Sequence, residues 1–172
     1  MKKFAIILLL ILFPSCATII NHPPAPQEQI DKAHNFEVEK GKARVYFFLG
    51  KYNGEKPQLN EAMEIYVNEK KVVTLGNKDE FAAIDLLPGF YAFKCKGLST
   101  GSGMATPVPL EMRVESGELV FLAATFFDKT PGVAYLFGAV GALVGKNFIY
   151  IFVKDDNFRQ VIGKYKLISL DE

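Results

Sequence analysis

Few residues of this chain combine the types and spacing that catalysis requires. The 172 residues include two cysteines and two histidines. A cysteine nucleophile needs a neighbouring base or positive field, yet His22 and His34 lie far upstream of Cys95. Alternation along residues 91–96 also places Cys95 on the apolar face of a strand. We therefore expect a buried, unreactive thiol.

A pair of carboxylates, Asp155 and Asp156, could serve in acid–base chemistry or bind a metal. The apolar residues after them recur at the helical spacing i, i+3, i+4, i+7, at Phe158, Val161, Ile162 and Tyr165. This spacing predicts a short amphipathic helix over 156–165, with the acidic residues as its cap. We accordingly predict no catalytic residue, cofactor or metal ligand.

A glycine-rich stretch over residues 97–106 invites comparison with phosphate-binding loops. No Lys-Ser/Thr pair follows its last glycine, and Pro107 and Pro109 oppose the helix that would hold the phosphate. We expect a surface connection between strands, with Gly101, Ser102 and Gly103 as candidate interaction residues.

A second glycine-rich stretch, residues 132–145, is apolar. Its candidate interaction residues combine bulky side chains with glycines that allow close approach, and they are Tyr135, Phe137, Gly138, Gly141 and Gly145. We expect this stretch to pack on the folded domain before a strand. Alternatively, residues 133–153, with Lys146 as their single charge, are long enough to cross a bilayer as a helix.

The N-terminus has the layout of a secretory signal. Lys2 and Lys3 precede an apolar run over residues 4–13, and Ser15 then precedes Cys16. The run is too short for a membrane-spanning helix, so residues 1–15 are predicted to be a signal peptide.

The residues around Cys16 resemble the lipobox of bacterial lipoproteins, with Phe13 and Pro14 departing from the common Leu-small-small pattern. The resemblance implies that Cys16 is acylated and becomes the mature N-terminus, and that its acyl chains anchor the protein in a membrane. Ala17 stands where an Asp would resemble an inner-membrane retention signal, which favours the outer membrane.

Charge gives little reason to expect a polyanionic partner. There are 20 basic and 19 acidic residues, a formal net charge of +1, so no strong field is available to attract nucleic acid. Hydrophobic residues make up 49% and charged residues 23%, which is typical of a folded globular domain.

Residues 16–41 include Pro23, Pro24 and Pro26 and show little apolar periodicity. They are predicted to form an extended tether in which His22 and His34 are solvated.

From residue 42 onward, period-two alternation predicts at least six strands joined by turns, hence an antiparallel β-sandwich over 42–172. Hairpins are predicted around residues 68–71 and 87–89. The predicted core residues are Val45, Phe47, Ile65, Val67, Phe93, Leu110 and Met112.

The order of motifs in residues 42–127, with a Leu-Pro-Gly-Phe-Tyr turn and a Gly-Glu-Leu-Val-Phe strand, resembles a family of bacterial envelope lipoprotein domains of unknown function. It is similar to PEGA-type β-sandwich lipoproteins. The resemblance implies no active site.

The sequence thus predicts a non-catalytic envelope lipoprotein that acts as a binding or scaffold module. Its expected partners are the membrane, through Cys16, and an unknown envelope protein or a second copy of itself, with no nucleic acid. Two alternatives remain: a membrane-active or assembly component that uses residues 132–145, and a carboxylate-based envelope hydrolase.

Overall fold

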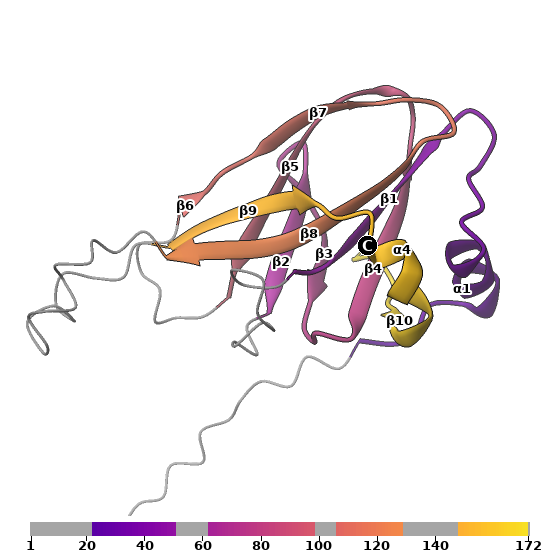
Figure 1. Ribbon diagram of the computed structural model, residues 1–172, viewed down its shortest axis with the longest axis horizontal. Helices are drawn as coiled ribbons and strands as arrows, with labels where there is room; N and C mark the ends of the chain where they lie inside the picture. The colour runs from indigo at the N-terminus through magenta and orange to yellow at the C-terminus, as the bar shows by residue number, and fades with distance from the viewer. Residues whose placement is uncertain (1–21, 51–61, 99–105, 129–147, 172) are drawn as a thin grey trace, which may run out of the picture.

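The computed structural model describes residues 22–50, 62–98, 106–128 and 148–171, and it confirms the predicted β-sandwich (Figure 1). One sheet has six strands in the order β10-β4-β1-β8-β9-β6. Its strands are β1 (Ala43–Leu49), β4 (Glu80–Leu86), β6 (Thr106–Pro107), β8 (Leu119–Asp128), β9 (Phe148–Lys154) and β10 (Lys166–Leu167).

The other sheet has four strands in the order β3-β2-β5-β7, and all its neighbours are antiparallel. Its strands are β2 (Met63–Val67), β3 (Lys70–Leu75), β5 (Gly89–Gly97) and β7 (Leu110–Val114).

Between the two sheets lies the main hydrophobic core. Five predicted core residues are buried there, namely Val45, Phe47, Ile65, Val67 and Phe93. Leu110 and Met112 are partly buried against the same core, because β7 is an edge strand of the smaller sheet.

The hairpin predicted around residues 68–71 is confirmed. Val67 pairs with Lys70, which leaves Asn68 and Glu69 as a two-residue turn with φ values of +48° and +66°. Positive φ at both central residues is the hairpin geometry that matches strand twist.

The hairpin predicted at residues 87–89 is wrong. β4 belongs to the six-stranded sheet and β5 to the four-stranded sheet, so the turn carries the chain from one layer to the other. The turn between β7 and β8 also crosses between sheets, and β8 then runs parallel to β1. The sandwich therefore contains parallel as well as antiparallel pairs.

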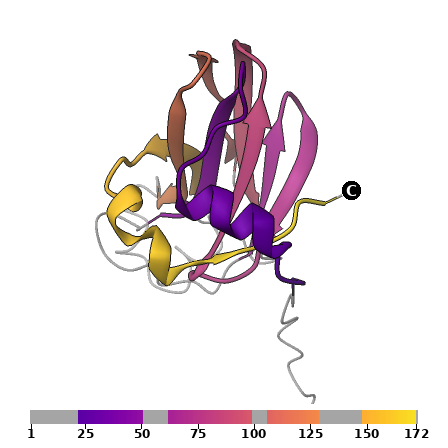
Figure 2. The same cartoon turned by 90° about the vertical axis from the view of Figure 1, so that its right-hand side faces the viewer.

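A second hydrophobic cluster covers the outer face of the six-stranded sheet. Tyr46 and Phe48 of β1 face this side and are buried, so β1 is covered on both faces. Phe158 packs on Phe48 with ring centroids 3.8 Å apart. The cover is supplied by α1 (Gln27–His34), α4 (Phe158–Val161) and the 3₁₀ helix η1 (Ile162–Lys164); Figure 2 shows α1 crossing the outer face of the strands.

Residues 22–36 thus belong to the folded domain, and the predicted extended tether over 16–41 is wrong for them. Pro24 forms a β-bridge with Ile168, and the N–H of Ala25 donates to the carbonyl of Leu167 at 3.3 Å. Pro26 immediately precedes α1, where a missing N–H costs little. Ala33 is 1% exposed, since one face of the helix packs on the sheet.

At the C-terminal end, the predicted short helix is confirmed as α4 followed by η1, with Phe158 and Ile162 buried. The predicted strand before it is β9. Residues 148–153 pair with β8, so a single membrane-crossing helix over 133–153 is wrong. In the part of the chain described, no helix has both the length and the apolar character needed to span a bilayer.

Candidate functional site

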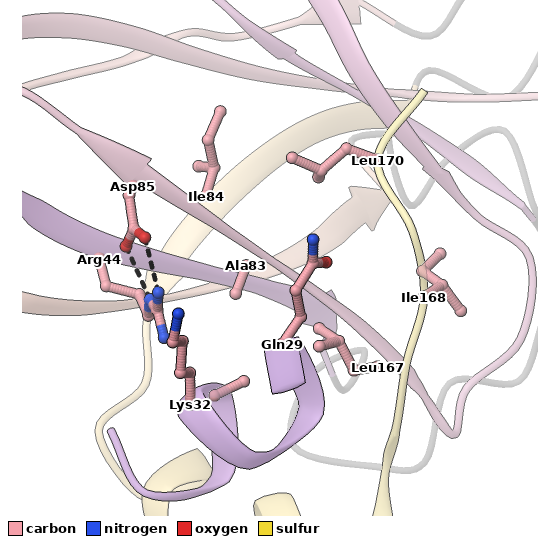
Figure 3. Close-up of a pocket in the computed structure, with 10 residues that line it drawn as sticks. Gln29, Lys32, Arg44, Ala83, Ile84, Asp85, Leu167, Ile168 and Leu170 are labelled. Atoms are coloured by element: carbon pink, nitrogen blue, oxygen red, sulfur yellow. Dashed lines mark hydrogen bonds and ion pairs between the residues drawn. The ribbon is translucent and has the colours of Figure 1, made fainter. Parts of the chain in front are cut away.

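A cleft lies between α1, the outer end of β4 and the C-terminal segment 167–170, and we refer to it as the α1 cleft (Figure 3). Its inner hollow has a volume of about 280 Å³. An outer hollow of about 270 Å³ adjoins residues 37–39, and both hollows are lined by Lys32, Arg44 and Asp85. The inner hollow is lined by Gln29, Lys32, Ala33, Arg44, Ala83, Ile84, Asp85, Leu167, Ile168 and Leu170.

An ion pair between adjacent strands borders both hollows. Arg44 of β1 lies opposite Asp85 of β4 in the antiparallel register. Its Nε donates to Oδ1 at 2.7 Å and its Nη2 to Oδ2 at 2.6 Å. The two side chains are 10% and 20% exposed, and the hydrogen bonds to Asp85 raise the pKa of the Arg44 guanidinium. Arg44 is therefore a fixed, permanently charged group beside the cleft.

The helix α1 brings two further donors to the cleft. Gln29 and Lys32 lie on its cleft side, and Figure 3 shows the Lys32 side chain extending towards the Arg44 guanidinium. Lys32 also donates to Glu28 one turn earlier, at 2.6 Å. This hydrogen bond raises the pKa of Lys32, so the amine stays charged at neutral pH. Because both partners are solvent-exposed, the pair is weak and can rearrange towards a ligand.

The apolar wall of the inner hollow comes from the other side. Leu167 and Ile168 are buried, while Leu170 is 38% exposed. After Ile168 the chain leaves β4, and the N–H of Asp171 donates to the carbonyl of Val72 on β3 at 2.9 Å. The departing chain opens the wedge that forms the hollow.

The edge of β4 beside this wedge carries free backbone groups. The carbonyl of Phe81 accepts from Ile168 N–H at 3.0 Å on the side away from β1. Because backbone groups alternate along a strand, those of Ala83 and Asp85 point to the same side. Within the described ranges, these groups have no hydrogen-bond partner on that side. The inner hollow thus borders an unpaired stretch of sheet edge.

Both histidines were expected in a solvated tether, and the structure corrects this. His22 Nδ1 lies 3.3 Å from Glu80 Oε2, a carboxylate that also accepts the N–H groups of Gly76 and Asn77. The ring of His34 stacks on Phe81 at 5.9 Å. They hold the N-terminal segment on the sheet and do not line the cleft.

The expected buried thiol is confirmed. Cys95 is fully buried in the main core, and burial raises its pKa to about 12. A thiol with so high a pKa supplies almost no thiolate at neutral pH.

The carboxylates Asp155 and Asp156 lie at the start of α4. Asp155 Oδ1 accepts the N–H of Asn157 at 3.1 Å, a local turn contact rather than a side-chain cap on the helix itself. Among described residues, no cluster of three His, Cys, Asp or Glu side chains could hold a metal ion.

The other sequence-predicted site residues lie outside the described residues. They are Cys16, Gly101, Ser102, Gly103, Tyr135, Phe137, Gly138, Gly141 and Gly145. The strands beside two of these segments are neighbours, because Thr106 of β6 pairs with Ile149 of β9. The interaction roles of the two glycine-rich stretches stay predictions.

The α1 cleft itself was not predicted. A signal for it exists, since Arg44 and Asp85 are charged residues inside otherwise apolar strands. Their pairing could not be read from the sequence, because the two residues lie 41 positions apart in the chain.

Comparison with known proteins adds no identity: no protein-family model matches the chain, and a search of curated proteins found no match.

Proposed function

We propose that this chain is a non-catalytic binding module of the bacterial cell envelope, anchored to the membrane by acyl chains on Cys16. The α1 cleft is its proposed binding site. The outer membrane is the proposed location, because Ala17 follows Cys16. We also propose that the chain belongs to the envelope lipoprotein family that its sequence resembles.

The observation that carries the proposal is the Arg44–Asp85 pair. Both charged groups facing the cleft from the sheet are held by two hydrogen bonds. Both carboxylate oxygens of Asp85 are occupied by the guanidinium, so this side chain is not free to act as a catalytic base or nucleophile. The same rigid pair is well suited to orient a bound ligand, since its geometry is fixed before the ligand arrives.

The proposed anchor would hold this cleft near the bilayer. Residues 17–21 separate Cys16 from the first described residue, His22, so these two residues are at most about 22 Å apart. A partner in or beside the same membrane would then meet the domain at high effective concentration.

Anchoring and binding are tested separately. Radiolabelled palmitate should enter the full-length protein in bacteria and be absent from the Cys16→Ser variant; unchanged labelling in that variant overturns the anchor. For binding, the lipidated protein is cross-linked in native envelopes and purified. Lys32→Glu in the cleft should reduce the recovery of a specific adduct, and Lys40→Glu, an exposed change of equal charge outside the cleft, should not.

Equal recovery from both charge-reversal variants would remove the α1 cleft from the proposal. Absence of any adduct from the unmodified protein would contradict the binding module as a whole.

A carboxylate-based hydrolase is the second candidate, because Glu37, Glu39 and Asp85 line the outer hollow. Glu37 and Glu39 are exposed, and Asp85 is engaged by Arg44. Such enzymes need one carboxyl group in an environment that keeps it protonated, so this arrangement supports hydrolysis less well than binding. Release of soluble fragments from purified envelope polymer, lost in Glu37→Gln, would favour the hydrolase.

A further inference from the structure

The strand β4 is paired along most of its length on one side and along a shorter part of it on the other. Residues 81–86 pair with β1, whereas β10 pairs with Glu80 and Phe81 alone among the strand residues of β4. The outer edge therefore changes from covered to open after Phe81. An open edge with free N–H and C=O groups is a template for another extended chain.

The open edge lies inside a cleft and not on a free surface. Ala83, Ile84 and Asp85 form one wall of the inner hollow. The buried Ala33 of α1 and the half-exposed Leu170 stand on the two sides of this edge. The hollow is thus bounded by backbone donors and acceptors on one side and by apolar side chains on other sides. An extended peptide could direct its backbone groups to the first and its side chains to the second.

One cation of the inner hollow is available to a ligand. The lining of this hollow includes Lys32, Arg44 and Asp85, and Arg44 is engaged by Asp85, while Glu37 and Glu39 line the adjoining outer hollow. Lys32 is 47% exposed at its side chain and shares its charge with an exposed glutamate. An acidic group entering the cleft therefore meets a cation that needs little desolvation or rearrangement.

We propose that the α1 cleft binds an extended, acidic peptide segment that adds as a strand to the edge of β4 at Ala83 and Asp85. Backbone hydrogen bonds to these two residues supply the attachment, and Lys32 selects the acidic side chain. This inference rests on the proposed role of the cleft as a binding site and names its ligand class.

The test uses the full-length protein in mild detergent and a defined probe, the acetylated heptapeptide Val-Thr-Val-Glu-Val-Thr-Val with a fluorophore. Matched peptides carry lysine at the centre or N-methyl groups that block backbone pairing. Fluorescence anisotropy should show binding of the glutamate peptide, about fivefold weaker binding of the lysine peptide, and none of the N-methylated one.

Ala83→Pro removes the outward N–H without removing a hydrogen bond to β1, and edge positions tolerate proline. This substitution should weaken binding of the glutamate peptide by about tenfold and leave the unfolding midpoint of the protein unchanged. Lys32→Glu should reverse the preference between the glutamate and lysine peptides, and Lys40→Glu should leave it unchanged.

Amide hydrogen exchange provides a readout at single residues. The amides of Ala83 and Asp85 should exchange fast in the free protein and more slowly when the peptide is added. The amide of Ile84, which points towards β1, should exchange slowly in both states. The proposal is overturned if no glutamate peptide binds at millimolar concentration, if Ala83→Pro binds it equally well, or if the Ala83 amide is already protected. If the peptide test fails but cross-linked adducts are still recovered from native envelopes, the proposed binding module is retained and only the acidic peptide is rejected as its ligand.

Discussion

The hydroxyl of Tyr46 on β1 donates a hydrogen bond to the carbonyl oxygen of Ala33 on α1, at 2.9 Å in the buried second cluster. Ala33 lies in the last turn of that helix, where carbonyl groups lack partners within the helix, and its carbonyl also accepts the N–H of Phe36 at 3.3 Å. This bond joins the N-terminal helix to the centre of the six-stranded sheet. The helix that forms one wall of the α1 cleft is therefore positioned by the sheet beneath it.

Replacing Tyr46 by Phe should lower the free energy of unfolding by about 0.5–1.5 kcal/mol, because the Ala33 carbonyl loses one of its two hydrogen bonds and keeps the one from the Phe36 N–H. Tyr66→Phe is the matched control, since its hydroxyl bonds the nearby Glu64 on a half-exposed face and should cost little. Urea unfolding followed by circular dichroism measures both. Equal losses in the two variants would contradict the role of Tyr46 in holding α1.

Alkaline pH should destabilise the fold through two buried groups. Burial raises the pKa of Tyr46 from 10 to about 12 and that of Cys95 from 9 to about 12. Because the unfolded groups release their protons first, their contribution is full below pH 9 and is lost as the pH rises to about 12. The urea midpoint should fall across this range and fall less in Tyr46→Phe/Cys95→Ala. Some dependence should persist, since the pKa values of Tyr66 and Tyr165 are also raised.

The Arg44–Asp85 pair should behave as a unit. Asp85→Leu leaves the Arg44 charge without its partner in a mostly buried position and should cost about 2–4 kcal/mol, and Arg44→Met should cost a similar amount. The double variant should be more stable than the sum of the two losses predicts, with a coupling of at least about 1 kcal/mol. Additive losses in this double-mutant cycle would show that the two hydrogen bonds contribute nothing.

Signals within one element were enough to predict the longer strands and the last helix. Alternation identified Val45, Phe47, Ile65 and Phe93 as core residues, and helical spacing identified Phe158. Such patterns depend on which face of an element is covered, and burial of that face is what the structure confirms.

Features set by distant segments were not predictable. The sequence around Pro88 is compatible with a hairpin and with a crossing between sheets, and the choice depends on whether β5 pairs with β4 or with β2. Likewise, Tyr46 alternates with core residues as an outward-facing side chain would, and it is buried because α1 covers it. The prolines before α1 hid that helix, since proline is favoured at helix starts as well as in extended linkers.

The turn between β2 and β3 carries a backbone strain that a single substitution should relieve. Glu69 has a φ of +66°, a left-handed conformation that costs a residue with a Cβ about 1 kcal/mol relative to glycine. Its ion pair with Lys94 is lost on substitution, but the Glu69 side chain is 75% exposed, so the pair contributes little. Glu69→Gly should therefore raise the free energy of unfolding by about 0.5–1 kcal/mol.

Two neighbouring variants separate backbone strain from side-chain contacts. Glu69→Ala loses the ion pair and keeps the strain, so it should be no more stable than the unmodified protein. Asn68→Gly should be destabilising despite the φ of +48°, because the Asn68 side chain accepts the N–H of Ala92 at 2.9 Å and asparagine tolerates this conformation. Urea unfolding of the three variants side by side decides the matter: a Glu69→Gly variant no more stable than Glu69→Ala would show that the turn is unstrained and that the hairpin geometry has another cause.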